Sequence, residues 1–359
     1  MDKIYVAALQ MVPGIGNRRL MKLIAFFGDA RQAWQAGRSD LVACLDEATC
    51  HNLIGIRQKL DILALAEKWQ EQGIRLSLLT DPDYPALLKP TFNPPLLLYY
   101  RGELPADNNS MAIVGGRRAS AYGLNAAQML GSELAAAGVC VVSGAARGVD
   151  TAAHRGALTK GRTIAVLGCG VDVSYPPENR DLLDRIAGQG AVISEYPPGT
   201  SPHPSFFPAR NRIISGLSRG IVVIEAAERS GALITVEHAL DEGRDVFAVP
   251  GSIFSAISKG CHNLIKQGAK LIDCTGDIFE EYQWSNSGTG AKAGELDLQP
   301  DEFAVYEQLS FDKPISLDEI VAATDLTVSA IAYIVLQLEL RGLVAEHGSQ
   351  YYVRTKGGI

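Results

Sequence analysis

Short apolar runs alternate with amphipathic segments through the middle of the chain. Seven runs of four to six residues predict β-strands at 111–115, 139–143, 163–168, 191–195, 221–225, 245–249 and 270–273. The segments between them have helical periodicity; within 121–137, leucine or alanine recurs at positions 124, 127, 130 and 134. Because the strands are almost continuously apolar and alternate with helices, they predict an α/β fold. We expect a Rossmann-like, mostly parallel, doubly wound sheet covered on both faces.

The first 80 residues have helical periodicity and predict an all-helical, SAM-like domain. Two amphipathic segments are joined by Val-Pro-Gly-Ile-Gly at 12–16, which predicts a helix-hairpin-helix unit. In such a unit the turn amides at Gly14 and Gly16, with Arg18 at the helix start, can meet a DNA phosphate. The same turn can instead do no more than pack two helices, and the sequence leaves both roles open. Residues 53–56 resemble a degenerate second copy of this hairpin.

Small and polar residues fill 281–300, which predicts a flexible linker. Beyond it, helices expected at 302–309, 316–324 and 327–341 and a hairpin at 343–353 predict a winged helix. The third helix has no basic residue before Arg341, whereas a helix that enters a DNA groove needs phosphate and base contacts. We therefore expect a helical domain at 1–80, a Rossmann-like domain at 81–280, the linker at 281–300 and a protein-binding winged helix at 301–359.

Composition narrows the setting of the protein. Apolar residues make up 47% of the chain and charged residues 20%, which allows a sizeable core. No apolar run approaches the ~18 residues of a membrane span, and the first residues lack a signal-peptide pattern. The six cysteines show no Cys-x-x-Cys spacing, so we expect reduced thiols, no metal site and a cytoplasmic protein.

The formal net charge of −7 argues against a nucleic-acid partner until its distribution is considered. Residues 1–80 carry ten basic against eight acidic residues, and residues 111–280 carry sixteen of each, twelve of the basic ones being arginine. Residues 296–359 carry four basic against ten acidic residues. The acidity is therefore concentrated near the C-terminal end, and the middle of the chain can still form a local basic groove.

Two predicted strands end in loops of small residues and arginine, at 114–117 and 143–147. Backbone amides at a strand end can close on a phosphate, and an arginine can add a bidentate contact. Because the carboxyl ends of parallel strands share one edge of the sheet, the two loops predict one anion site where the strand order reverses. The alternative is a tight turn whose arginine faces solvent. The candidate phosphate-binding residues are Gly115, Gly116, Arg117, Ser143, Gly144 and Arg147.

Neither loop completes a known nucleotide motif. The first lacks the third glycine and the acidic residue of the dinucleotide fingerprint, and the chain has no Gly-x-x-x-x-Gly-Lys-Ser/Thr, which excludes ATP hydrolysis by a P-loop. Asp150 and His154 lie four residues apart and can form an acid–base pair, although helix capping and a structural histidine are preferred. Glu225 and Glu237 are the best candidates for catalytic carboxylates. Helix capping and solvation at the surface are again the preferred interpretations. We expect no catalytic residue.

The stretch 206–235 places aromatic rings and guanidinium groups at the start of a predicted helix, before a buried strand and a Ser-Gly turn that opens another helix. Rings, guanidinium groups and helix N-termini suit an anionic ligand with flat bases. That ligand is a nucleotide or a single-stranded nucleic acid. The candidate residues are Phe206, Phe207, Arg210, Asn211 and Arg212.

Four motifs in order resemble those of the DNA-processing protein DprA/Smf family: Ala-Ile-Val-Gly-Gly-Arg-Arg-Ala, Val-Ser-Gly-Ala-Ala-Arg-Gly-Val-Asp, Phe-Pro-Ala-Arg-Asn-Arg-Ile-Ile-Ser-Gly-Leu-Ser and Val-Phe-Ala-Val-Pro-Gly-Ser-Ile. The resemblance is dense over residues 80–275. The expected N-terminal helical domain and C-terminal winged helix are also typical of this family. It implies a homodimer, formed through the Rossmann-like domain, that binds single-stranded DNA without sequence specificity and uses no cofactor. It further implies that the protein protects incoming strands and loads the RecA recombinase in natural transformation.

The resemblance also assigns roles to residues. The loop at 115–117 stands where the family's Gly-Ser/Thr-Arg loop meets phosphate, and the second loop and the Phe-Pro-x-Arg-Asn-Arg motif supply the rest of the site. The chain departs from the family at Gly116, where Ser or Thr is usual, and at Cys261 and His262, where an Asn is common. The change at Gly116 removes a hydroxyl donor but keeps the backbone amides, so we expect weaker anchoring at most.

Two rival interpretations remain. The same sheet resembles that of the "lonely guy" phosphoribohydrolases, which cleave nucleotide N-glycosidic bonds. Their Pro-Gly-Gly-x-Gly-Thr-x-x-Glu turn is replaced here by Glu-Arg-Ser-Gly-Ala-Leu-Ile-Thr-Val-Glu, in which one Gly of that turn remains. The second rival is a scaffold for the recombinase that holds DNA away from Arg117.

Overall fold

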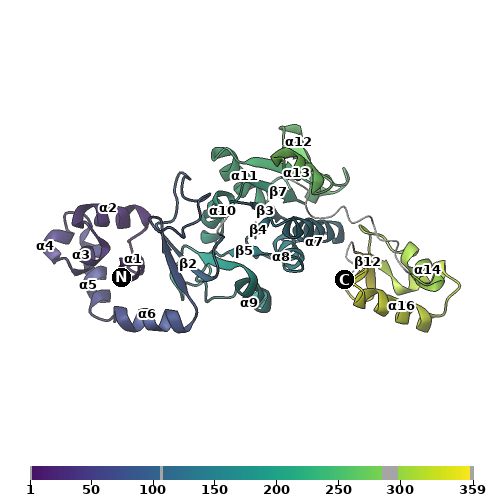
Figure 1. The fold of residues 1–359 in the computed structure, drawn as a ribbon, viewed down its shortest axis with the longest axis horizontal. Helices are drawn as coiled ribbons and strands as arrows, with labels where there is room; N and C mark the ends of the chain where they lie inside the picture. Colours follow the sequence, from purple (N-terminus) through teal and green to yellow (C-terminus); the bar gives the residue numbers. More distant parts are fainter. Residues whose placement is uncertain (1, 106–107, 285–297, 356–359) are drawn as a thin grey trace.

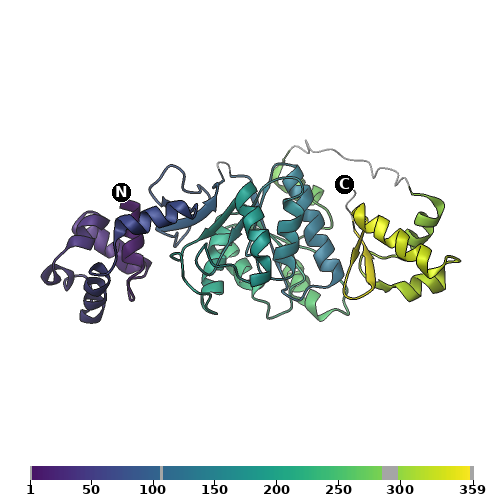
Figure 2. The same cartoon turned by 90° about the horizontal axis from the view of Figure 1, so that it is seen from below.

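The computed structural model describes residues 2–105, 108–284 and 298–355, and these form three parts in a row along the longest axis (Figure 1). Helices make up the N-terminal part, a large sheet with helices forms the middle, and a small helical unit with a hairpin lies at the other end. Figure 2 shows the same row from a perpendicular direction. The order of the three parts agrees with the prediction.

The N-terminal part is helical, as predicted, and its helices share one apolar core. Ile15 donates its N–H to the carbonyl of Val12 in the hairpin between the first two helices, and Gly16 caps the second. The predicted second hairpin at 53–56 is wrong, because α5 runs through Gly55 without a break. The helices are α1 (Asp2–Gln10), α2 (Asn17–Phe27), α3 (Ala30–Gln35), α4 (Arg38–Leu41), α5 (Glu47–Arg57) and α6 (Ile62–Glu71).

The middle part is built on a nine-stranded sheet with the order β1-β2-β6-β5-β4-β3-β7-β8-β9. β1 pairs antiparallel with β2 and β2 antiparallel with β6, and all other neighbours are parallel. The strands are β1 (Arg75–Leu78), β2 (Leu97–Gly102), β3 (Ser110–Gly115), β4 (Cys140–Ser143), β5 (Thr163–Val166), β6 (Ala191–Ser194), β7 (Gly220–Ile224), β8 (Asp245–Ala248) and β9 (Lys270–Leu271).

The seven predicted strands are therefore confirmed as β3 to β9, with bounds that agree to within two residues. β1 and β2 are additional, and the expected domain boundary at residue 80 falls between these two paired strands. Trp69 of α6 packs edge-on against Tyr99 of β2, with ring centroids 5.7 Å apart. The helical part is thus joined to the sheet through a shared core.

Helices cover both faces of the sheet, as the continuous apolar strands predict. Ile213, Val236 and Leu264 belong to the core on one face, and Leu130, Ala153 and Phe279 belong to the core on the other. On the first face lie α10 (Phe206–Gly216), α11 (Ala232–Asp241) and α12 (Lys259–Lys266). On the second lie α7 (Ala121–Ala136), α8 (Val149–Ala157), α9 (Arg180–Gln189) and α13 (Gly276–Tyr282).

Short 3₁₀ turns, Pro177–Asn179 and Ala256–Ser258, precede α9 and α12. After β3 the chain adds β4, β5 and β6 on one side, then returns to add β7, β8 and β9 on the other. The strand order therefore reverses between β3 and β7. In open α/β sheets, ligands bind at the carboxyl edge of this position.

The C-terminal part is the predicted winged helix with its own small core. Its elements are α14 (Pro300–Gln308), β10 (Ile315–Ser316), α15 (Leu317–Ala323), α16 (Val328–Leu340), β11 (Val344–Glu346) and β12 (Tyr351–Arg354). Most of the predicted linker lies outside the described residues. Among the described helices, none alone has the length and apolar character to span a membrane; α15 and α16 pass that test as a pair, but with a bend of 116°.

Candidate functional site

A pocket of about 380 Å³ opens at the carboxyl edge of the sheet, where β3, β4 and β7 end. Its walls come from the loops after β3 and β4 and from the first turns of α10 and α11. A recess of about 40 Å³ adjoins it and shares Arg117, Phe207 and Arg210 as lining. We call the two together the strand-edge pocket. Its lining includes Gly115, Arg117, Gly144, Arg147, Tyr175, Phe207, Arg210, Asn211, Ser230 and Gly231.

An aromatic pair and one arginine form the mouth of the strand-edge pocket. The ring of Phe207 stacks on Tyr175, with centroids 5.2 Å apart and planes inclined by 28°. The guanidinium carbon of Arg117 lies 5.6 Å from the centroid of Phe207. Arg117 is exposed, and among the described residues no carboxylate lies within ion-pair distance of it. Its positive charge is therefore available to an anion.

The two arginine-bearing loops touch each other, as the sequence predicts. Val149 donates its N–H to the carbonyl of Gly116 at 3.2 Å. Gly148 has a φ of +78°, and a Cβ there would lie 2.3 Å from the same carbonyl oxygen. Glycine is required at 148 because other residues strain in this conformation and because the loops approach so closely.

Arg210 is mostly buried, with an exposure of 5%, although it lines both parts of the strand-edge pocket. Its guanidinium donates to the carbonyls of Gly144, at 2.8 Å, and Val166. The carboxylate of Asp150, also buried, accepts the N–H groups of Gly144 and Ala146, both at 3.2 Å. Burial lowers the pKa of Arg210 to about 10, and burial raises the pKa of Asp150. Arg210 therefore fixes the ends of β4 and β5 from the buried side of the pocket lining, and its expected contact with a ligand stays a prediction.

Three predicted residues do not line the strand-edge pocket. Arg212 pairs with the carboxylate of Glu195, and the two side chains are 15% and 16% exposed. Ser143 is fully buried and donates its hydroxyl to the carbonyl of Ile113 at 2.6 Å. Gly116 offers its carbonyl to the neighbouring loop. Ser143 and Arg212 therefore hold the framework and do not face a ligand, which corrects both expectations.

The other predicted residues of the two loops and of α10 line the pocket, except Phe206, which stacks on Tyr196. Asn211 donates its amide to the carbonyl of Gly231 at 3.3 Å and so ties α10 to the start of α11. Arg147 is exposed and pairs with Glu178. The hydrogen bond from Arg147 lowers the pKa of the Glu178 carboxyl. A ligand anion must therefore compete with Glu178 for Arg147, whereas Arg117 is free.

The candidate catalytic carboxylates and the histidine have structural roles. Glu225 is buried and accepts the backbone N–H of Ser120 at 2.7 Å, so it holds the residue whose side chain caps α7. Glu237 is exposed on α11. His154 is fully buried, with its Nδ1 2.7 Å from the hydroxyl of Thr163, and desolvation lowers the pKa of His154 to about 3. Its partner is Thr163, and the preferred structural interpretation of His154 is confirmed.

The N-terminal hairpin residues Gly14, Gly16 and Arg18 lie far along the chain from this pocket, in the helical part. Gly14 has a φ of +96°, and its carbonyl accepts a hydrogen bond from Arg19 at 2.8 Å. Gly16 and Arg18 are exposed. The exposed hairpin is compatible with both roles that the sequence leaves open.

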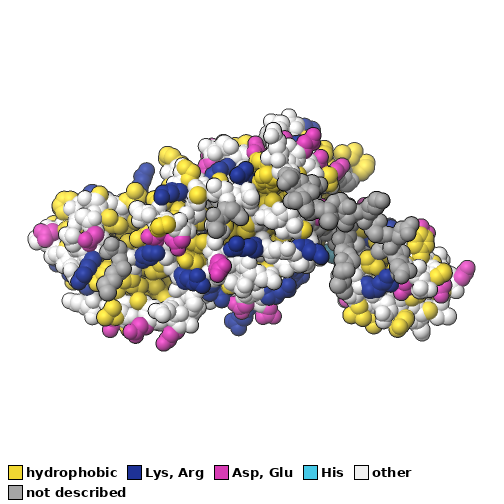
Figure 3. Space-filling view, in the orientation of Figure 1, with side chains coloured by type: hydrophobic (Ala, Val, Ile, Leu, Met, Phe, Trp, Pro, Cys, Tyr) yellow, Lys and Arg dark blue, Asp and Glu magenta, His cyan; other side chains and the backbone are white. Residues whose placement is uncertain are grey.

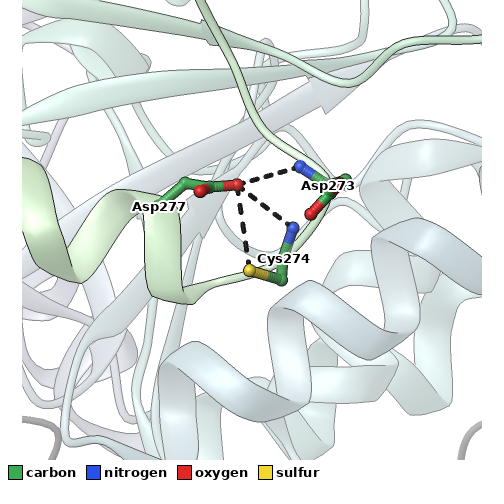
Figure 4. A group of neighbouring side chains, drawn as sticks. All are labelled: Asp273, Cys274 and Asp277. Atoms are coloured by element: carbon green, nitrogen blue, oxygen red, sulfur yellow. Dashed lines mark hydrogen bonds between the residues drawn. The ribbon is translucent and has the colours of Figure 1, made fainter.

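One group of potential metal ligands exists among the described residues, and it lies away from the pocket. Asp273, Cys274 and Asp277 place their ligand atoms within 4.8 Å of one another (Figure 4). The Asp277 carboxylate accepts the backbone N–H of Asp273 at 3.1 Å and that of Cys274 at 3.4 Å. These bonds explain the cluster as the turn that leads into α13. The other five cysteines are buried.

Known proteins resemble the chain across all three parts. Residues 75–283 match the family model of DNA recombination-mediator protein A, and residues 289–350 match that of the DprA winged helix domain. Protein Smf of Synechocystis is 34% identical over 98% of this chain and 99% of its own.

Two solved structures are also similar. DNA processing protein A from Streptococcus pneumoniae has a TM-score of 0.67 and 37% identity, and the match covers 77% of this chain and 97% of that one. DNA processing protein A from Helicobacter pylori, described for its unique single-stranded DNA binding mode, has a TM-score of 0.52 and 29% identity. That match covers 58% of this chain and 96% of the other.

Proposed function

The chain belongs to the DprA/Smf family of DNA-processing proteins, and we propose that it binds single-stranded DNA in the strand-edge pocket. The observation that carries this proposal is the exposed, unpaired Arg117 beside the stacked rings of Phe207 and Tyr175. A guanidinium for a phosphate and a ring for a base match the two parts of each nucleotide. The start of α11, at Ser230 and Gly231, adds the positive end of a helix.

Binding of this kind tolerates any sequence. Every phosphate carries the same charge, and every base has a face that can stack, at about 1–3 kcal/mol per base. The phosphate contacts come from Arg117, the amide of Gly115 and, once it leaves Glu178, Arg147. The chain supplies these contacts itself, without a cofactor.

The cellular role we propose is that of the family. The protein protects incoming single strands in the cytoplasm and loads the RecA recombinase onto them during natural transformation. It acts as a homodimer formed through the Rossmann-like domain. Family membership supports the proposal that single-stranded DNA, RecA and a second copy of the chain are the partners. The strand-edge pocket is the proposed site for the DNA.

The exposed face of α16, in the winged helix, binds a protein rather than DNA. The exposed side of α16 carries Val328, Tyr333, Leu336 and Leu340. It has no basic residue, so it offers little to a phosphate backbone. Apolar side chains on an exposed helix face mark a protein-binding surface.

The N-terminal hairpin is a second, weaker DNA contact in this proposal. Gly16 leaves the amides at the start of α2 accessible, and Arg18 is exposed next to them. An Arg18→Ala variant should weaken the binding of long single strands by a few-fold, with no effect on short ones held in the strand-edge pocket. Equal loss for both lengths would place Arg18 outside this role.

The phosphoribohydrolase interpretation makes a separate prediction. It requires release of free base from a nucleoside monophosphate, lost on Glu237→Gln. Glu237 is exposed and lies outside the pocket lining, and the buried Glu225 is engaged by Ser120, so neither supports this activity. Base release by the wild type that stops in the Glu237 variant would establish the enzyme instead.

The test of the proposed function is oligo-dT binding over a salt series, with Arg117→Ala compared against Arg185→Ala. Arg185 is exposed on α9 and outside the pocket, so its variant removes the same charge elsewhere. We expect Arg117→Ala to bind more weakly, with a log–log salt slope shallower by about 0.7, the value for one phosphate of a single strand. Identical titrations of the two variants would move the DNA away from this pocket and favour the scaffold.

A further inference from the structure

A cleft of about 360 Å³ separates the winged helix from the middle part. One wall is formed by the start of α7 and the outer side of α8, and the other by β11, β12 and the turn between them. Figures 1 and 2 both show these strands beside α7. The cleft is lined by Arg117, Arg118, Gln128 and Arg155 from the middle part and by Glu346 and His347 from the winged helix.

One side chain bridges the two walls. The amide nitrogen of Asn125, on α7, donates to the carbonyls of Phe311 and Arg354, both at 3.0 Å. These bonds seat the winged helix on α7 and leave the cleft open beside the contact. The cleft is therefore a defined space between two folded parts.

The cleft adjoins the strand-edge pocket, because Arg117 lines both. Arg118 follows Arg117 directly, and Arg155 projects from the last turn of α8. Both are exposed, and among the described residues neither has a carboxylate within ion-pair distance. Three unpaired arginines thus follow one another from the pocket into the cleft.

The carboxylate of Glu346 does not neutralise these arginines. It accepts the backbone N–H of Gln350 at 2.9 Å and so closes the turn between β11 and β12. Figure 3 shows Lys and Arg side chains over the middle part and several acidic side chains on the winged helix. The acidic winged helix therefore faces the exposed arginines across the cleft.

We propose that single-stranded DNA leaves the strand-edge pocket past Arg117 and continues through this cleft, where Arg118 and Arg155 each contact a phosphate. This inference rests on the proposed function and adds a second segment to the DNA path. The winged helix forms the outer wall and keeps the strand against α7 and α8. A strand in the cleft has guanidinium groups on one side and the polar wing on the other.

The experiment compares two lengths of oligo-dT, one of about six nucleotides and one of about twenty, because a single binding platform holds about 4–16 nucleotides. The variant is Arg118→Ala/Arg155→Ala in the full chain. Lys160→Ala/Arg185→Ala is the matched control, since it removes two exposed charges outside the cleft and the pocket. Arg118→Lys/Arg155→Lys restores the charge without the guanidinium.

For the long oligonucleotide we expect the double alanine variant to lose about 1.4 in log–log salt slope, two phosphates at 0.7 each. That loss corresponds to roughly twenty-fold weaker binding at 0.1 M salt. The short oligonucleotide, held in the strand-edge pocket, should bind the variant and the wild type alike. The lysine variant should keep the wild-type slope.

Three results would overturn the inference. Equal binding of the long oligonucleotide by the alanine variant and the wild type would leave the cleft empty of DNA. Tighter binding by that variant would mean that the arginines attract the acidic winged helix, and that this contact blocks the cleft against DNA. Loss of both lengths in the alanine variant alone would mean that the arginines shape the strand-edge pocket. If the wild type binds neither length, the proposed function fails and the DNA path fails with it.

Discussion

Arg117 and Phe207 lie against each other at the mouth of the strand-edge pocket, with the guanidinium carbon 5.6 Å from the ring centroid. They come from different loops and different motifs, one after β3 and the other at the start of α10. The contact keeps a cation beside a ring on which a base can stack. The two side chains should therefore affect DNA binding in different ways.

Replacing Phe207 with leucine should weaken oligo-dT binding roughly ten-fold while leaving the salt slope unchanged. The ring contributes stacking, about 1–3 kcal/mol per base, and no charge. Phe206→Leu is the matched control, because Phe206 stacks on Tyr196, with centroids 4.3 Å apart, and does not line the pocket. A change of slope in the Phe207 variant, measured by fluorescence anisotropy over a salt series, would mean that the ring acts by holding Arg117.

Glu178 holds Arg147 in an ion pair at the recess, so it should inhibit DNA binding. Glu178→Gln removes the competing carboxylate, and we expect tighter binding with a salt slope steeper by about 0.7. Asp184→Asn is the control: it removes the same charge and releases Arg101 from its 2.9 Å ion pair away from the pocket. Equal gains in both variants would show a general effect of net charge, and no gain would place Arg147 off the DNA path.

The fold follows from the sequence wherever local pattern is sufficient. The parallel strands are buried on both faces, so each appears as an apolar run, and the winged helix has clear helical periodicity. β1, at the edge of the sheet, and β2 beside it were not predicted from the sequence. They pair with each other across a long loop, and Arg75 pairs with Tyr100. A strand that depends on a distant partner leaves little local signal.

The site was harder to predict than the fold, because arginine has two different roles in it: one arginine is exposed to a ligand and another is buried and holds the framework. Arg117 and Arg210 both occur in glycine- or proline-containing motifs, and the sequence gives them the same expected role. Arg117 is exposed, whereas Arg210 is buried, bonded to the carbonyls of Gly144 and Val166. The difference arises from where the ends of β4 and β5 lie, and that depends on tertiary structure. Tyr175 had a usable signal, since it opens a Tyr-Pro-Pro segment at the sheet edge.

Arg212 should matter for stability rather than for DNA. Arg212→Leu leaves the partly buried Glu195 carboxylate without its cation. Removing one partner of a fully buried pair costs about 3–5 kcal/mol, so we expect a smaller loss of stability here. Urea unfolding should show this loss for Arg212→Leu, and Arg212→Leu/Glu195→Leu should recover part of it. Arg185→Leu, an exposed control, should change stability by less than about 0.5 kcal/mol. If Arg212→Leu leaves the free energy of unfolding unchanged but binds oligo-dT poorly, Arg212 belongs to the DNA site.

His154 should make the protein less stable as the pH falls from about 6.5 towards 3. Thr163 donates its hydroxyl to the carbonyl of Val141 at 2.6 Å, so His154 must donate its Nδ1–H to Thr163, and its buried Nε2 has no partner among the described residues. The folded pKa is about 3, below the usual 6.5, so the unfolded chain takes up the proton first and stability is lost on acidification. Relative to His154→Leu, the wild type should lose about 2 kcal/mol between pH 7.5 and pH 5. Urea unfolding at both pH values measures this difference, and parallel pH dependences for the two proteins would show that His154 does not stay neutral in the folded state.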